Sequence, residues 1–467
     1  MSPRNAPPAD EPSPSADLSP DIAARPEAEL PPAATAFHLF TDDISSYEDD
    51  GPLGEVERLI AAGDREGAIA HAEAAARETE GLAASLAHRL IDLGEPARAA
   101  ALIEPLAAEG RANARALILL ARALSLAGRH QEALDALNEA SFLDGRSATV
   151  LLALGSARLA AEDAARAIGD FERVLRLSTG ESEREANERA EAHFRLGEAW
   201  ASMDEPGRAA RHFKASQADD PADRRGAGIR LAELEAQPAP TRASAAYVRA
   251  LFDGYAPRYD GHMTGALSYR GPDILLAAAE AVADFSVDGP YDAVDLGCGT
   301  GLSGAAFRAH CRTLLGVDLS PRMCAAAEAS GFYTEVRAGD LLKALDAAPS
   351  RFGLAIACDT VIYLGDLEPL FAALEKALSP KGWFVFSTEK SDGASEEARA
   401  RGFEIGPARR FRHTEAYLRA LAARHGFEVV SMDAAALRTE KRVPVESFVA
   451  AMRRCGDAAG AIELSFH

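Results

Sequence analysis

A short glycine-rich segment places the tightest limit on how this chain can fold. Residues 292–304 read Asp-Ala-Val-Asp-Leu-Gly-Cys-Gly-Thr-Gly-Leu-Ser-Gly, so an apolar run enters Asp295 and then a turn in which Gly297, Gly299 and Gly301 alternate. Glycine lets the backbone turn sharply and approach a ligand without a clash from a Cβ atom. We therefore expect a strand and a turn here, with a nucleotide-like ligand at the carboxyl end of the first strand of an α/β sheet.

A second acid makes this prediction more specific. The apolar run 314–317 ends in Asp318, 23 residues after Asp295. An acid at the end of the second strand can accept hydrogen bonds from both ribose hydroxyls of an adenosine. NAD-binding turns space their glycines G-x-G-x-x-G, whereas this turn has G-x-G-x-G behind an acid. The pattern resembles motif I of the class I S-adenosylmethionine (SAM)-dependent methyltransferases, which implies SAM as cofactor; a dinucleotide is the alternative.

The ends of further predicted strands supply more candidate residues for binding this cofactor. Asp340 follows the third strand and could accept the adenine amino group, with Leu341 and Met323 as apolar contacts to the adenine ring. Asp359 follows the fourth strand, on the side where methyl donor and acceptor would meet. Each of these acids could instead cap the helix that follows it.

An aromatic segment precedes the predicted sheet. Residues 247–269 hold four of the nine tyrosines of the chain. Such a segment could fold over the cofactor and exclude water from the reaction. We assign this lid role to Tyr255 and Tyr259; the alternative is an amphipathic helix that packs on the sheet.

Three residues are candidates for a general base, which some methyl acceptors need. They are Asp359, Tyr363 and His413. His413 lies beside Arg409, Arg410 and Arg412, whose guanidinium groups could hold an anionic acceptor such as a carboxylate. The alternative for His413 is a polar residue at the start of a helix. The five cysteines form no CxxC pair and show no metal-ligand spacing, so we predict no metal site and a reducing, cytoplasmic environment.

A repeat of 34 residues organises the first half of the chain. Ala99, Ala133 and Ala167 are spaced by 34, and a large residue follows each of them by four positions: Ile103, Leu137 and Phe171. A last unit carries Leu196, Gly197, Ala209, Phe213 and Pro221. The polar stretch 178–187 holds about eight extra residues, which we expect to loop out. The period resembles the tetratricopeptide repeat (TPR), whose stacked helix pairs bind protein partners; a generic alanine-rich bundle is the alternative.

Composition sets the domain limits and excludes some partners. We expect a disordered Pro/Ala-rich tail over 1–45, the repeat domain over 46–223, a Pro-rich semi-rigid linker over 224–242, and the methyltransferase domain with its lid segment over 243–467. The net charge of −22 disfavours nucleic acid as a partner. The chain has no apolar run of 18 residues, so no membrane span is predicted.

Alternation of strands and helices predicts a doubly wound sheet after the repeats. The expected strands are 293–296, 314–318, 334–337, 354–357, 383–387, 428–432 and 444–451, the last two forming an antiparallel hairpin because 438–443 is too short for a helix. The fold class is thus α/β: an all-α TPR solenoid followed by a seven-stranded, Rossmann-like class I methyltransferase domain.

A closer resemblance extends over residues 243–455. The segments 251–260 (Leu-Phe-Asp-Gly-Tyr-Ala-Pro-Arg-Tyr-Asp), 363–366 (Tyr-Leu-Gly-Asp), 412–417 (Arg-His-Thr-Glu-Ala-Tyr) and 437–440 (Leu-Arg-Thr-Glu) look like the bacterial predicted methyltransferases that carry tetratricopeptide repeats. The resemblance implies SAM binding at the acids and glycines named above and says little about the acceptor, a small molecule or a protein. The alternative function is a TPR scaffold whose methyltransferase-like domain senses SAM or is only structural.

Overall fold

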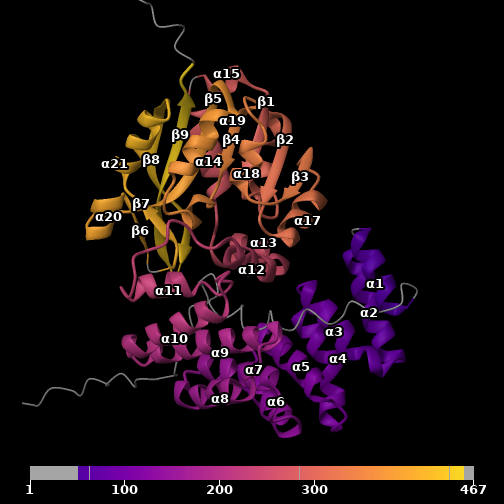
Figure 1. Ribbon diagram of the computed structural model, residues 1–467. Coiled ribbons are helices and arrows are strands. Elements are labelled where there is room, and N and C mark those ends of the chain that lie inside the picture. Colours follow the sequence, from indigo (N-terminus) through magenta and orange to yellow (C-terminus); the bar gives the residue numbers. More distant parts are fainter. Residues whose placement is uncertain (1–50, 63, 283, 407, 441, 457–467) are drawn as a thin grey trace, which may run out of the picture.

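The computed structural model describes residues 51–456 except 63, 283, 407 and 441 (Figure 1). The tail predicted over 1–45 lies outside the described residues. A helical array forms one half of the molecule and an α/β domain the other (Figure 1). Between them lie α11 (Ala227–Glu233), α12 (Ala245–Tyr255) and α13 (Tyr259–Gly261) (Figure 1). None of the helices in the described part of the chain combines the length and apolarity needed to cross a bilayer.

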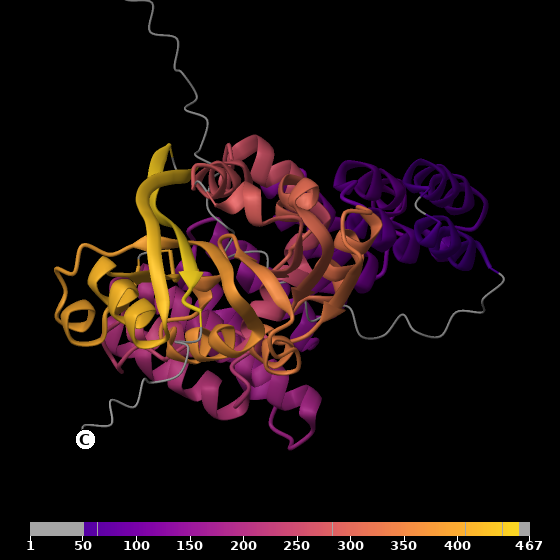
Figure 2. The ribbon, with the colours of Figure 1, turned by 90° about the horizontal axis from the view of Figure 1, so that it is seen from above.

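The helical array consists of antiparallel helix pairs that stack one after another (Figures 1 and 2). The successive helices are α1 (Pro52–Ala61), α2 (Arg65–Glu78), α3 (Ala83–Asp92), α4 (Pro96–Ala108), α5 (Ala114–Leu126), α6 (His130–Leu143), α7 (Ala148–Ala160), α8 (Ala164–Leu177), α9 (Glu183–Ser202) and α10 (Pro206–Asp219). The second helices of three consecutive pairs begin at residues 96, 130 and 164, which reproduces the 34-residue period seen in the sequence.

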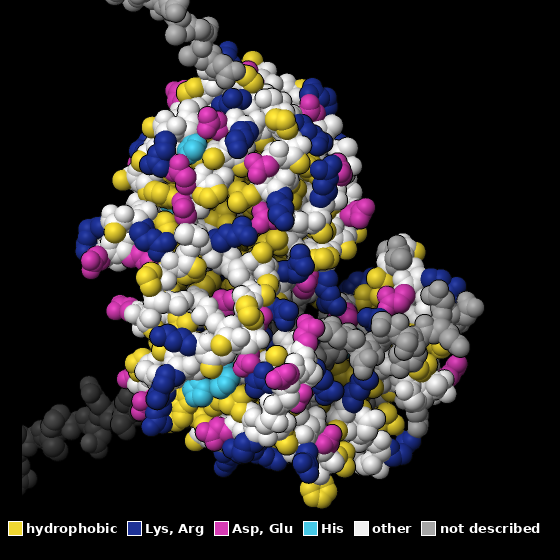
Figure 3. Space-filling model, viewed as in Figure 1, with side chains coloured by type: hydrophobic (Ala, Val, Ile, Leu, Met, Phe, Trp, Pro, Cys, Tyr) yellow, Lys and Arg dark blue, Asp and Glu magenta, His cyan; other side chains and the backbone are white. Residues whose placement is uncertain are grey.

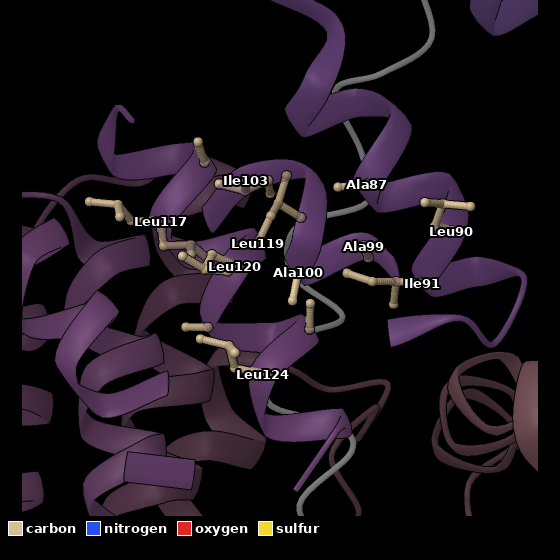
Figure 4. Close-up of a cluster of buried hydrophobic side chains, with 14 of the residues drawn as sticks. Ala87, Leu90, Ile91, Ala99, Ala100, Ile103, Leu117, Leu119, Leu120 and Leu124 are labelled. Carbon is tan, nitrogen blue, oxygen red and sulfur yellow. The ribbon is translucent and has the colours of Figure 1, made fainter. Parts of the chain in front are cut away.

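The four helix pairs from α3–α4 to α9–α10 each place a small residue of the first helix against a large residue of the second. The large residue follows the small one by 16 positions, and all are buried: Ala87 and Ile103, Ala121 and Leu137, Gly155 and Phe171, Gly197 and Phe213. A Cβ atom on Gly155 would lie 2.6 Å from the ring of Phe171, and one on Gly197 would lie 2.5 Å from the ring of Phe213. Figure 4 shows the core in which Ala87 and Ile103 lie.

The extra residues of the last repeat do not loop out as predicted. Helix α9 has 20 residues, whereas the equivalent helices α5 and α7 have 13 each. The insertion therefore lengthens α9 at its amino end, where Ser182 caps the helix by accepting a hydrogen bond from the backbone N–H of Glu185. A polar helical surface can face water, so the polarity of 178–187 did not require a loop.

The segment predicted as a spacer packs tightly instead. It contains α11 (Ala227–Glu233), in which Ile229 and Leu231 are buried. Leu231 packs with Phe213 of the array, and Ile229 packs with Tyr363 of the α/β domain. The prediction of a spacer relied on the prolines of the segment, whereas the apolar residues of α11 determine its contacts.

Ion pairs add further contacts between the two halves. Arg409 lies 3.1 Å from the Glu198 carboxylate of α9, and Arg322 lies 3.4 Å from Asp92 of α3. On the face shown in Figure 3, acidic and basic side chains are interspersed. Through α11 and these two ion pairs, the array packs directly against the α/β domain.

The α/β domain is built on one mostly parallel sheet. Its strands are β1 (Tyr291–Leu296), β2 (Cys311–Asp318), β3 (Glu335–Ala338), β4 (Phe352–Ala357), β5 (Leu378–Lys390), β6 (Phe403–Ile405), β7 (Phe411–His413), β8 (Phe427–Glu440) and β9 (Val443–Arg454). The parallel strands run in the order β3-β2-β1-β4-β5, and β9 is inserted antiparallel between β5 and β8. The predicted closing hairpin is confirmed. The short strands β6 and β7 were not predicted; β7 pairs with the end of β5, and β6 pairs with β7.

Helices cover both faces of the sheet. The helices of the domain are α12 (Ala245–Tyr255), α13 (Tyr259–Gly261), α14 (Gly271–Glu280), α15 (Phe285–Asp288), α16 (Leu302–Phe307), α17 (Pro321–Ala329), α18 (Leu341–Asp346), α19 (Glu368–Ala377), α20 (Glu396–Arg401) and α21 (Glu415–Arg424). Of these, α12 and α13 lie at the carboxyl ends of the strands and not on a face of the sheet (Figure 1). Val294 and Leu296 of β1 share a core with α18, α19 and α21, whereas Ala293 shares the opposite core with α14 to α16. This alternation is the period of two expected of a strand buried on both faces.

Candidate functional site

A pocket opens at the carboxyl ends of the parallel strands, beneath α12. It encloses about 800 Å³ of space not filled by protein atoms, open solvent included. Its described lining residues are Arg242, Ala243, Ala245, Val248, Phe252, Tyr259, Gly297, Gly299, Val317, Asp318, Leu319, Gly339, Asp340, Leu341, Leu342, Cys358, Asp359, Thr360, Tyr363 and Leu364. They come from the turns after β1 to β4 and from the segment before the sheet.

The glycine turn has the backbone that its sequence predicts. Gly297, Gly299 and Gly301 have φ angles of +75°, +54° and +105°, all in the left-handed region. A Cβ atom on Gly297 would lie 2.3 Å from the Thr360 hydroxyl, so only glycine fits there. A Cβ atom on Gly299 would meet no protein atom within 4 Å, although Gly299 lines the pocket. Gly299 thus leaves room where a ligand can approach the backbone.

Asp318 lies at the end of β2 and is oriented by two backbone amides. Its Oδ1 accepts a hydrogen bond from the N–H of Ser320 at 2.8 Å, and its Oδ2 accepts one from the N–H of Gly299 at 3.0 Å. Burial raises the pKa of this carboxyl, and the two amides oppose the shift. Each carboxylate oxygen keeps a second lone pair, so a pair of ligand hydroxyls can still bind.

Asp295 lies behind the pocket and does not line it. It is fully buried in β1 and accepts a hydrogen bond from the Tyr333 hydroxyl at 2.8 Å, while its Oδ1 has no partner among the described residues. Burial raises its pKa to about 7, which the hydrogen bond from Tyr333 opposes. A Cβ atom on Gly304 would lie 2.5 Å from the Tyr333 ring. Tyr333 therefore supports the turn, a contact that the sequence analysis missed.

The residues expected to hold the adenine divide between the pocket and the core. Asp340 and Leu341 line the pocket. Asp340 is also a helix cap, since its Oδ1 accepts from the N–H of Leu342 at 2.9 Å, and its Oδ2 accepts from Arg242 at 3.1 Å. Met323 was predicted to touch the adenine, but it is fully buried and does not line the pocket. Leu319, next to Asp318, occupies the pocket wall instead.

The aromatic segment before the sheet covers the pocket. Val248 and Phe252 of α12 and Tyr259 of α13 line it, whereas Tyr255 lies behind Tyr259 with its ring centroid 5.1 Å away. Several hydrogen bonds fasten this segment to the sheet domain, among them one from Arg249 to the carbonyl of Leu319 at 3.1 Å. The Ser320 hydroxyl donates to Asp253 at 2.6 Å, and the Thr300 hydroxyl donates to Asp260.

Asp359 reaches the pocket from the end of β4 in a left-handed backbone conformation, with φ of 52°. Its Oδ2 accepts from Nη1 of Arg438 at 2.5 Å, and Arg438 also contacts Glu389 and Glu440. Arg438 is 3% exposed. Because Arg438 lies 79 residues further along the chain, nothing in the local sequence indicates this pairing.

Tyr363 and Arg242 form the edge of the pocket together. The backbone N–H of Ala243 donates to the carbonyl of Tyr363 at 2.9 Å, and the N–H groups of Gly365 and Asp366 donate to the carbonyl of Thr241. The Tyr-Leu-Gly-Asp segment thus binds the end of the segment that was predicted as a linker. These backbone hydrogen bonds bring Arg242 to the pocket, and the residues next to Arg242 in the sequence do not predict that position.

His413 lies away from the pocket. It is fully buried in β7; its Nδ1 lies 2.6 Å from the Thr388 hydroxyl and its Nε2 lies 3.0 Å from the Gly365 carbonyl. A carbonyl only accepts, so Nε2 carries the proton and Nδ1 accepts from Thr388. Burial lowers the pKa of His413 to about 4. Both nitrogens are therefore engaged, and the structure contradicts the prediction of a catalytic base here.

The neighbouring arginines also have structural partners. Arg409 pairs with Glu198, Arg410 pairs with Glu389 at 2.5 Å and with Glu440 at 2.6 Å, and Arg412 donates to the carbonyl of Lys390. None of the three lines the pocket. The prediction that they bind an anionic acceptor is wrong, because their partners come from distant parts of the chain. Within the described residues, no cluster of three or more His, Cys, Asp or Glu side chains is arranged to bind a metal ion.

Comparison with known proteins assigns the domain that holds this pocket. Residues 294–386 match the family model described as a methyltransferase domain. No curated protein matches the chain. Similar solved structures include a SAM-dependent methyltransferase from Mesorhizobium loti, which is 26% identical over 39% of this chain and 96% of that one, with a TM-score of 0.31.

Two other similar structures contain S-adenosylhomocysteine (SAH). The 1,6-didemethyltoxoflavin-N1-methyltransferase of Burkholderia thailandensis is 22% identical over 47% of this chain and 93% of that one, with a TM-score of 0.36. The magnesium protoporphyrin IX methyltransferase of Synechocystis is 15% identical over 39% and 83%, with a TM-score of 0.31. The methyltransferase-domain match spans β1 to β5 and includes the glycine turn, Asp318 and Asp359. The protein is therefore a SAM-dependent methyltransferase, and SAM is its methyl donor.

Proposed function

We propose that SAM lies along the strand ends of this pocket and that its methyl group passes to an acceptor bound beside Asp359, under the cover of α12. The observation that carries the proposal is the shared wall of Gly297, Gly299, Asp318 and Asp340. It places open backbone and two carboxylates on one side of the cavity, as an adenosine requires.

In this arrangement each lining residue has a defined part. Asp318 accepts the ribose hydroxyls, Asp340 accepts the adenine amino group, and Leu319 and Leu341 pack on the adenine ring. Asp295 and Gly301 support the turn from behind. SAM supplies an electrophilic methyl group on a sulfonium. The chain contributes position and the exclusion of water, since a displacement of this kind depends mainly on alignment.

The helical array is proposed to be a TPR solenoid that recruits a protein partner. The 34-residue spacing, the antiparallel pairs and the small-to-large contact within each pair support this proposal. The partner could itself be the acceptor, or the array could serve assembly while the acceptor is a small molecule. We place the array at 46–223 and the methyltransferase domain at 243–467, joined by the packed segment 224–242, in a cytoplasmic protein.

Binding of SAH tests the cofactor site directly. Asp318→Ala removes an acceptor for two hydroxyls, and hydrogen bonds to a charged group contribute about 1.5–3 kcal/mol each, so we expect SAH affinity to fall about 100-fold or more. Asp346→Ala is the matched control, because Asp346 lies on α18 with a side chain 60% exposed. Calorimetry gives both affinities. SAH binding by Asp318→Ala at the wild-type affinity would refute the proposed placement.

Labelled-methyl transfer tests the role of the array. Purified full-length protein and methyl-labelled SAM are added to an extract of cells that lack the protein, and protein and small-molecule fractions are then separated. Label in a protein band favours recruitment through the array, and label among small molecules favours an assembly role. Intact SAH binding with no labelled product would favour the alternative, a scaffold that senses SAM.

A further inference from the structure

One carboxylate oxygen at the reaction end of the pocket has no partner in the protein. Asp359 Oδ2 is held by Arg438, whereas Asp359 Oδ1 is buried and accepts no hydrogen bond from the described residues. The Asp359 side chain is 10% exposed, and the residue lines the pocket. A buried acceptor without a donor is costly, so the bound ligand is the natural source of that donor.

The carboxylate is held rigidly. The N–H of Asp359 donates to the Ser387 hydroxyl at 2.9 Å, and its φ of 52° is rare for a residue with a Cβ atom. Strain of this kind is kept at functional sites where the surroundings enforce it. Arg438 is itself held by Glu389 and Glu440, so it fixes Oδ2 and leaves Oδ1 as the oxygen free to accept.

The charges around the pocket discriminate between classes of acceptor. Among its described lining residues, Asp318, Asp340 and Asp359 are acids and Arg242 is the one cationic side chain. Arg242 is already paired with Asp340 at 3.1 Å. A carboxylate or phosphate acceptor would therefore meet the Asp359 carboxylate without a cation left to pair with, because Arg438 is already bound by Asp359, Glu389 and Glu440.

The other walls of this end of the pocket are aromatic. The Phe252 ring lies 5.5 Å from that of Tyr363 and 6.4 Å from that of Tyr259, centroid to centroid. Burial raises the pKa of both tyrosines, and the charge of Asp359 adds to this, so both phenols stay neutral. Such walls suit an apolar body and supply no charge.

From this arrangement we infer that the methyl acceptor is a neutral N–H or O–H group on an apolar body, and that it donates its hydrogen to Oδ1 of Asp359. The inference rests on the proposed function. The acceptor lone pair forms the bond to the methyl carbon while the carbon–sulfur bond breaks, and its electrons return to sulfur, which leaves as a neutral thioether. The acceptor proton passes to Asp359, and Arg438 acts as a positioning residue.

The chemical stability of the product tests the acceptor class. Product labelled by full-length protein and methyl-labelled SAM in the extract is treated with mild alkali, which releases a methyl ester as volatile methanol and leaves N-methyl and ether O-methyl groups intact. We expect the label to stay with the product. Release of volatile label would overturn the inference, whereas SAH binding without any labelled product would count against the proposed function itself.

Variants separate acceptor contact from cofactor contact. For Asp359→Asn, kcat should fall about 100-fold, the lower range of proton-transfer contributions, with SAH affinity within about twofold of wild type. Arg438→Lys should retain more of kcat than Arg438→Met, because lysine keeps a cation beside Oδ2. Glu446→Gln is the control on the same hairpin, since the side chain of Glu446 is 72% exposed and its carboxylate lies 3.5 Å from Lys390. Loss of SAH binding by Asp359→Asn with kcat unchanged at saturating SAM would assign Oδ1 to the methyl donor and overturn the inference.

Discussion

The contact between Gly197 and Phe213 allows a quantitative test of how the repeats pack. Gly197→Ala adds a Cβ atom 2.5 Å from the Phe213 ring, where ordinary contacts begin near 3.4 Å. The ring must therefore move by roughly 1 Å. It has little freedom to do so, because it is fully buried, lies 5.4 Å from the Phe194 ring and has the Arg230 guanidinium over it at 5.2 Å.

Two opposing effects set the size of the change. Alanine is favoured over glycine within a helix by about 1 kcal/mol, whereas overpacking costs about 1–3 kcal/mol. Gly197→Ala should therefore lower the free energy of unfolding by up to about 2 kcal/mol. Gly169→Ala is the control, because a Cβ atom there meets nothing within 4 Å, and it should stabilise by about 0.5–1 kcal/mol.

A double substitution isolates the contact. Phe213→Leu gives the α9–α10 pair the leucine that the α5–α6 pair has at Leu137, opposite Ala121, so Gly197→Ala should cost little in that background. The coupling should be about 1–2 kcal/mol. Urea denaturation is followed by the fluorescence of Trp200, which lies on α9 with Gly197, in a common Trp383→Phe background that leaves Trp200 as the sole tryptophan. Stabilisation by Gly197→Ala equal to that by Gly169→Ala, or strict additivity in the double variant, would refute the reasoning.

Three further predictions concern the site and the contact between domains. Gly299→Ala should still fold, with the free energy of unfolding lowered by about 1–2 kcal/mol because residue 299 has a left-handed φ. It should weaken SAH binding about 10-fold or more, because its Cβ atom enters the pocket. Urea denaturation measures the first effect and calorimetry the second, and an unchanged SAH affinity would contradict the placement of SAM. The pKa of His413 falls from 6.5 to about 4 on folding, so the free energy of unfolding is highest above pH 6.5 and drops by about 2 kcal/mol at pH 5. Urea titrations at pH 8 and pH 5 should show that His413→Asn lacks this drop. A pH dependence of the variant identical to that of the wild type would contradict the prediction. Arg409→Ala removes one partner of the partly buried Glu198 and should weaken the contact between the two domains by about 1–3 kcal/mol. Separate unfolding transitions of the array and the methyltransferase domain are the expected readout, and a single unchanged transition would argue against this prediction.

Local features of the sequence were enough to predict most of the elements. The 34-residue spacing placed the helix pairs, because each pair buries a small and a large residue at the same positions of its own two helices. The glycine turn and Asp318 could also be predicted, since a tight turn with left-handed φ angles requires glycine wherever it occurs. The hairpin of β8 and β9 followed from the short connection between two apolar runs.

The predictions that failed depended on contacts between distant parts of the chain. His413 and the arginines beside it matched the composition of a catalytic loop, but β7 carries them into the sheet and against the helical array. The segment 224–242 was predicted as a spacer from its prolines, although α11 is buried between the domains. Met323 was placed at the adenine from its distance to Asp318, whereas its position on α17 turns it into the core.

The sequence by itself determined which segments become helices, strands and turns, and which acids end the strands, because these properties depend on neighbouring residues. Only the tertiary structure decided which of those residues act together. It joined Asp359 to Arg438, Tyr333 to Asp295, and Arg242 to Asp340 across 79, 38 and 98 residues. The physical reason is that a buried charge or hydroxyl takes its partner from whichever strand or loop the topology brings beside it, and sequence distance does not record that choice.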